Sequence, residues 1–167
     1  MKALRWLVIA LVVAGCTDRA LMSPPAAQAS LIGDLLGATG LLQCSDLAYA
    51  STTQTIGSAG GVIRVGPHTL SIPAGALSAP VAITGALVTG HGVNAVQFQP
   101  AGLKFQRSAS LSMSYANCNL LGRLLPKRVA YVSDALNILS YLLSLDNLFA
   151  KQVTGRVNHF SNYAVAW

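Results

Sequence analysis

Beyond residue 50 the sequence alternates between short runs of β-prone apolar residues and clusters of turn-forming residues. A glycine pair precedes the run at 62–65, and Gly66-Pro67 separates it from an alternating run at 68–72. Similar runs follow at 81–88, 93–99, 109–115, 128–132, 153–157 and 160–167. Short strands at even spacing, separated by glycine and proline, are typical of sandwiches and barrels. We therefore predict an all-β fold, an antiparallel two-sheet β-sandwich, for residues 52–167.

Two stretches fit more than one structure. The run of Leu, Ile and Tyr at 136–145 fits a buried strand or a helical turn. The apolar segment at 31–42 contains glycines that weaken any helix. It can form a short helix or an extended piece on the domain or on a membrane, and we favour packing against the domain.

The last run predicts which of its faces is buried. Alternate residues of a strand point to the same face of a sheet. Tyr163, Val165 and Trp167 therefore share one face, which carries the larger groups. We predict that this face lies in the core.

The N-terminus has the layout of a secretory signal peptide. Basic residues precede an apolar run at 6–13, and the small pair Ala14-Gly15 is followed by Cys16. This pattern resembles the bacterial lipobox, in which the cysteine is diacylated before the peptide is cut in front of it. The apolar run is shorter than the roughly 20 residues that a membrane span needs. We predict a lipoprotein signal peptide at 1–15 and lipidation of Cys16; the alternative is a secreted protein with a chance cysteine.

The residues after the cleavage site predict where the protein is held. Thr17 rather than aspartate follows the cysteine, which favours the outer membrane of a bacterial envelope over the inner one. Residues 16–51 form the lipidated N-terminus and tether, since their first half is rich in Ala, Ser and Pro. We therefore predict that the protein binds the membrane through its lipid anchor.

The two remaining cysteines form a natural pair. If Cys16 carries lipid, Cys44 and Cys118 are left together in an oxidising compartment. A disulfide is the simplest interpretation, and two buried free thiols are the alternative.

Composition excludes several function classes. All acidic residues are aspartates, and the sequence offers no paired carboxylates for glycoside chemistry and no acidic calcium loop. The net charge is +6, but the basic residues form no stripe with interleaved aromatics, so we expect no nucleic-acid partner. The densest basic group is expected to be solvated surface, with weak attraction to anionic lipid or lipopolysaccharide as the alternative: Arg123, Lys127 and Arg128.

The histidines show no ligand spacing. His68, His91 and His159 fit no zinc pattern, so we predict no metal site, no cofactor, and histidines in turns or on the surface. A Ser-His-Asp hydrolase lacks a GxSxG elbow.

Four pieces in order resemble a known family. They are Gly60-Gly61-Val62-Ile63, residues 70–77 with Ile72-Pro73-Ala74-Gly75-Ala76, residues 98–105 with Pro100-Ala101-Gly102-Leu103-Lys104-Phe105, and the closing His159-Phe160-Ser161-Asn162-Tyr163-Ala164-Val165. Together they are similar to the ZU-five domain, over roughly residues 54–167. The resemblance implies a β-sandwich used for interaction or scaffolding. Fold alone does not transfer a partner.

The closing piece carries one chemical possibility. In some ZU-five domains the tripeptide at His159-Phe160-Ser161 is cut by the protein itself, between Phe and Ser. The serine hydroxyl attacks the preceding carbonyl, with the imidazole as general base. The alternative, which we favour, is that these residues are simply part of a β-strand.

These observations predict a lipid-anchored envelope protein that is not an enzyme and acts as a binding or structural module. Its further partner is an envelope protein or a glycan. Self-processing between Phe160 and Ser161 is the alternative function, and an envelope hydrolase is the least favoured.

Overall fold

The computed structural model describes residues 40–120 and 125–167. These residues form antiparallel strands joined by turns. The strands are β1 (Ser51–Ile56), β2 (Gly61–Val65), β3 (His68–Ile72), β4 (Val81–Val88), β5 (Ala95–Gln99), β6 (Lys104–Ser114), β7 (Arg128–Val132), β8 (Ile138–Tyr141), β9 (Ser144–Asn147), β10 (Gln152–His159) and β11 (Asn162–Ala166). Most begin or end at the glycines and prolines that the sequence marks as turns.

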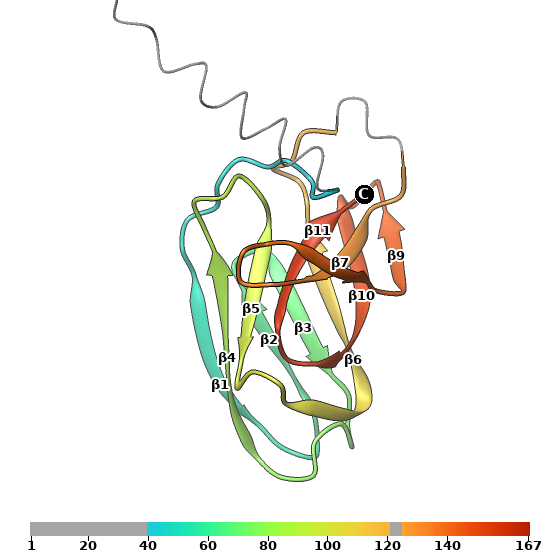
Figure 1. Ribbon diagram of the computed structural model, residues 1–167. Helices are drawn as coiled ribbons and strands as arrows, with labels where there is room; N and C mark the ends of the chain where they lie inside the picture. Colours follow the sequence, from blue (N-terminus) through green and yellow to red (C-terminus); the bar gives the residue numbers. More distant parts are fainter. Residues whose placement is uncertain (1–39, 121–124) are drawn as a thin grey trace, which may run out of the picture.

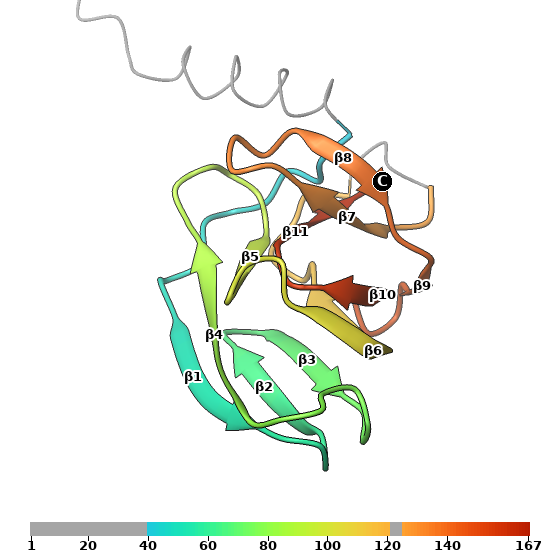
Figure 2. The same cartoon turned by 60° about the horizontal axis from the view of Figure 1, so that its bottom comes forward.

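The strands form two sheets that face each other (Figures 1 and 2). The six-stranded sheet has the order β1-β4-β5-β11-β7-β8, and the five-stranded sheet has the order β2-β3-β6-β10-β9. Every pairing between named strands is antiparallel. The predicted all-β, two-sheet antiparallel sandwich is thereby confirmed.

The main core lies between the two sheets. It is built from the inward-facing residues of both, such as Leu70 and Leu111 from one sheet and Phe98 and Tyr163 from the other. In β3 every second residue is buried, and β2 and β4 show the same alternation after a half-buried first residue, as the period-two pattern requires. The alternation in the sequence therefore decides which side chains fill the sandwich.

β11 departs from this pattern because both of its faces are buried. Tyr163 and Val165 point into the main core, as predicted, while Trp167 lies beyond the strand and is half-buried against that core. Ala164 and Ala166 are buried too, in a second apolar cluster. The prediction of one buried face is thus incomplete, because β11 lies between β5 and β7 and is covered from both sides.

Residues 40–42, which precede β1, cover part of β11 on the side of the second apolar cluster. Leu41 joins the second cluster, and Leu42 joins the main core. Backbone hydrogen bonds run from Leu42 N–H to the Val165 carbonyl and from Trp167 N–H to the Gly40 carbonyl, both at 3.0 Å. Residues 40–42, for which packing against the domain was favoured, are packed there; residues 31–39 lie outside the described residues.

Candidate functional site

The predicted lipidation site cannot be placed, because Cys16, the signal peptide at 1–15 and the tether up to residue 39 lie outside the described residues. Among the residues that are described, no helix is long and apolar enough to cross a membrane.

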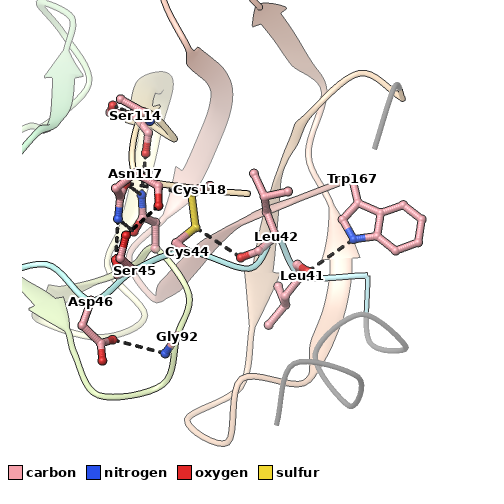
Figure 3. The surroundings of a disulfide bond; sticks show 12 residues. Leu41, Leu42, Cys44, Ser45, Asp46, Gly92, Ser114, Asn117, Cys118 and Trp167 are labelled. Carbon is pink, nitrogen blue, oxygen red and sulfur yellow. Dashed lines mark hydrogen bonds between the residues drawn. A yellow bond between two sulfur atoms is a disulfide. The ribbon is translucent and has the colours of Figure 1, made fainter. Parts of the chain in front are cut away.

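Cys44 and Cys118 form a disulfide (Figure 3), which confirms the predicted pair. It joins the segment before β1 to the turn after β6, across 74 residues of sequence. β6 is the central strand of its sheet, so the bond ties the N-terminal segment to the middle of the sandwich.

A polar network beside the disulfide fixes the same segment. Asn117 Nδ2 donates to the Ser45 carbonyl at 2.6 Å, and Ser45 Oγ donates to the Asn117 carbonyl at 3.0 Å. The buried Asn94 donates through Nδ2 to Asn117 Oδ1 at 2.7 Å. Figure 3 shows Asn117 and Ser45 hydrogen-bonded beside the disulfide. The network is structural, since its polar atoms pair with one another.

His159 is the last residue of β10, and Phe160 and Ser161 form the tight connection to β11, so the favoured placement of this tripeptide in a β-strand is right only for His159. Phe160 is fully buried and stacks on Phe98, with ring centroids 5.7 Å apart. Its carbonyl accepts a hydrogen bond from Gly102 N–H at 3.0 Å, and its own N–H donates to the Leu103 carbonyl at 2.8 Å. The Pro-x-Gly-Leu-x-Phe piece thus holds this connection through its backbone.

The catalytic groups of a self-cleavage reaction are not engaged with each other. The His159 ring packs edge-on against Tyr131, with centroids 5.1 Å apart. No hydrogen bond joins the His159 imidazole to the Ser161 hydroxyl among the described residues, whereas the Tyr163 hydroxyl donates to the His159 carbonyl. Burial raises the pKa of Tyr163, which keeps this donor protonated. Among the described residues, a single donor, the Gly102 N–H, bonds the Phe160 carbonyl, where an oxyanion would form.

The other histidines lie far from such chemistry. His91 is exposed in a loop, but His68 is buried at the start of β3, so its assignment to a turn or the surface is wrong. It faces inward because the period-two pattern of β3 places it with Leu70 and Ile72. Within residues 40–120 and 125–167, no group of three or more His, Cys, Asp or Glu side chains could hold a metal.

The basic cluster is also only partly solvated. Lys127 is buried, and its Nζ donates to the Leu125 carbonyl at 2.6 Å. Its backbone N–H donates to Asp146 Oδ2 at 2.8 Å. The prediction of solvated surface is therefore wrong for Lys127 and right for the exposed Arg128, while Arg123 lies outside the described residues.

A polar groove lies on the outer face of the five-stranded sheet, away from the core. We call it the serine–arginine groove; it has a volume of about 360 Å³ and is lined by Ser71, Pro73, Arg107, Ser108, Ser110 and Arg156. This groove was not predicted from the sequence. The available signal was the serine at every second position of 108–114, opposite buried apolar neighbours.

Exposed apolar residues gather on β8, β9 and the turn that follows. We call them the apolar strip: Leu139, Tyr141, Leu143, Leu145, Leu148 and Phe149. Leu145 is 78% exposed and Phe149 fully so. The predicted buried strand or helical turn at 136–145 is therefore wrong, because β8 and β9 are edge strands of the two sheets and leave most of these leucines uncovered.

A scan of the sequence against protein-family models found no match, and a search of curated proteins found none either.

Proposed function

We propose that this chain is a lipid-anchored protein of the bacterial cell envelope, held at the outer membrane, whose β-sandwich is a non-catalytic binding or structural module. Lipid on Cys16 attaches it, and an envelope protein or a glycan is its further partner. A ZU-five-like origin of the sandwich is part of the proposal. Its support is that two pieces of the resemblance lie at turns of this fold: the Ile-Pro-x-Gly-Ala piece follows β3, and the Pro-x-Gly-Leu-x-Phe piece connects β5 and β6.

The observation that carries the proposal is the position of the apolar strip beside the point where the chain enters the sandwich. A Cβ on Gly40 would lie 2.8 Å from the Tyr141 hydroxyl, so the first described residue touches the strip. In Figure 2 the first coloured residues accordingly lie beside β8. A lipid at Cys16 would hold this end of the domain near the bilayer.

The chemistry of the strip suits a bilayer surface. Leucine and phenylalanine side chains gain from leaving water, and tyrosine is favoured at the interface between lipid and water. The guanidinium of Arg128 lies 5.5 Å from the centre of the Tyr141 ring, and Lys151 is exposed beyond Phe149. Positive charge at the border of an apolar surface favours anionic lipid headgroups.

The anchor is tested by Cys16→Ser. The parent should fractionate with membranes, and intact-mass measurement should show a mature chain that begins at Cys16 and carries diacylglycerol. The variant should accumulate uncleaved or in the soluble fraction. A variant that matures and fractionates like the parent would show that the lipobox interpretation is wrong.

The orientation is tested by a fluorescent probe in the strip. Phe149→Trp, in a Trp167→Phe background, should be quenched by brominated lipids when the lipidated protein is in liposomes. The matched control is Val62→Trp, which is 45% exposed on β2, at the opposite edge of the five-stranded sheet. Equal quenching of the two probes would contradict the orientation.

Self-processing between Phe160 and Ser161 is the second candidate, favoured by the Gly102 N–H on the Phe160 carbonyl. The packing of His159 against Tyr131 supports an intact chain instead. We expect one species by denaturing mass spectrometry. Two species that merge into one in Ser161→Ala would favour self-processing.

A further inference from the structure

The serine–arginine groove has a regular polar floor. Ser71 on β3 pairs with Ser110 on β6, and Ser110 pairs with Arg156 on β10. The three residues therefore form a row across three neighbouring strands, with the strand spacing of about 4.8 Å between them. All three are exposed on the outer face of the sheet.

The second arginine is held in place by the turn after β3. Arg107 Nη1 donates to the Ala74 carbonyl at 3.0 Å, and a Cβ on Gly75 would lie 3.6 Å from its Cδ. Gly75 has a φ of +75°, a conformation that glycine adopts readily, and it lies in the turn whose Ala74 carbonyl accepts from Arg107. The Ile-Pro-x-Gly-Ala motif thus positions one cationic wall of the groove.

Ser108, another residue that lines the groove, is also fixed by a hydrogen bond. Ser108 Oγ donates to Asn158 Oδ1 at 2.6 Å. Two of the lining side chains, Arg107 and Ser108, are therefore fixed by hydrogen bonds.

The positive charge of the groove has no carboxylate partner within the described residues. The aspartates described accept hydrogen bonds elsewhere: Asp46 from the amides of Gly90 and Gly92, Asp134 from Asn162, and Asp146 from Tyr115 and Lys127. Two guanidinium groups beside unpaired hydroxyls form a surface that favours an anion.

We propose that the serine–arginine groove binds a phosphorylated saccharide, with its phosphate at Arg107 and Arg156 and its hydroxyls on Ser71 and Ser110. This rests on the proposed function, since it names the ligand class of the binding module. Guanidinium groups bind phosphate oxygens in bidentate fashion. Serine hydroxyls both donate and accept, as sugar hydroxyls do.

The shape and lining of the groove distinguish this ligand from others. A volume of about 360 Å³ lies at the lower end of small-ligand sites and accommodates a sugar ring with its phosphate. Single-stranded nucleic acid would call for aromatic side chains on which its bases stack, and the lining residues are serine, arginine and proline.

The test uses the lipidated full-length mature protein in a non-ionic detergent, titrated with glucose 1-phosphate while backbone amide NMR signals are followed. The amides of Ser71, Ser110 and Arg156 should shift in the millimolar range. Arg156→Gln should weaken binding by about tenfold or more, because a charged hydrogen bond is lost. Arg64→Gln removes the same charge from an exposed position on β2, outside the lining of the groove, and should leave binding unchanged.

Four results would overturn the proposal. They are the absence of shifts at these amides, equal weakening by Arg64→Gln, equally tight binding of inorganic phosphate, and equally tight binding of glucose. The amide spectrum of each variant also reports whether it is folded. Membrane attachment is measured separately with Cys16→Ser, so a failure here leaves the anchor proposal intact and the reverse also holds.

Discussion

His68 should make the stability of this protein depend on pH. Its Nδ1 accepts a hydrogen bond from Ser114 N–H at 3.1 Å, so the neutral ring carries its proton on Nε2. Nε2 is buried and has no hydrogen-bond partner in the part of the chain that the structure describes. A protonated ring could not accept from Ser114, and its charge would lie in the core without a counterion. Burial accordingly lowers the pKa of His68 from its usual 6.5 to about 4.

The sign and size of the effect follow from that pKa. The unfolded chain takes up a proton at His68 near pH 6.5, while the folded chain resists it down to about pH 4. The contribution of neutral His68 is therefore complete above pH 6.5 and is lost as the pH falls toward 4. At about 1.4 kcal/mol per pKa unit, the loss in the free energy of unfolding is about 3 kcal/mol.

Urea unfolding between these pH values would measure the effect. His68→Asn keeps an acceptor for Ser114 N–H but does not titrate, so its stability should fall less steeply with pH than that of the parent. His91→Asn, at an exposed position, is the matched control and should follow the parent. Parallel curves for the parent and His68→Asn would refute the reasoning, whatever the offset between them.

Three other changes test the packing. Replacing Cys44 and Cys118 together by alanine should lower the free energy of unfolding by about 4 kcal/mol in urea titrations, because a long loop is released. Gly85→Ala should cost about 1–3 kcal/mol in the same assay, since its Cβ would lie 2.5 Å from a core side chain; Gly57→Ala, with 3.7 Å to its nearest neighbour, should be close to neutral. Deletion of 163–167 should abolish the β-sheet signal in far-UV circular dichroism; a native spectrum would contradict the central role of β11.

Much of the fold could be predicted because glycine and proline mark the turns and alternation marks the strands. β3 and β7 have the predicted bounds, His68–Ile72 and Arg128–Val132. The disulfide could be predicted from the pairing of two leftover cysteines. The turns and strands could be predicted because their sequence patterns are local, and the disulfide because only two cysteines were left to pair.

Three of the four edge strands, β1, β8 and β9, could not be predicted in this way. β1, Ser51–Ile56, is almost entirely polar and is exposed along most of its length, so it carries no apolar alternation. In β8 and β9 the leucines suggested a core, yet most of them face solvent. Burial of an edge strand depends on what lies next to it in space, and neighbouring sequence does not reveal that.

The serine–arginine groove shows the same limit for the site. Ser71, Ser110 and Arg156 are far apart in the sequence and meet only through the order β3-β6-β10. His159 and Ser161 are close in the sequence, yet no hydrogen bond joins their side chains in the described structure, because the connection to β11 turns between them. Register, rather than proximity along the chain, decides which side chains can act together.

The central position of β11 also constrains the order in which the strands of the six-stranded sheet can assemble during folding. β11 is the last strand along the chain, yet it separates β5 from β7 and contributes to both apolar clusters. Until it arrives, β1-β4-β5 and β7-β8 have no common neighbour, so a ribosome-bound chain cannot complete the six-stranded sheet.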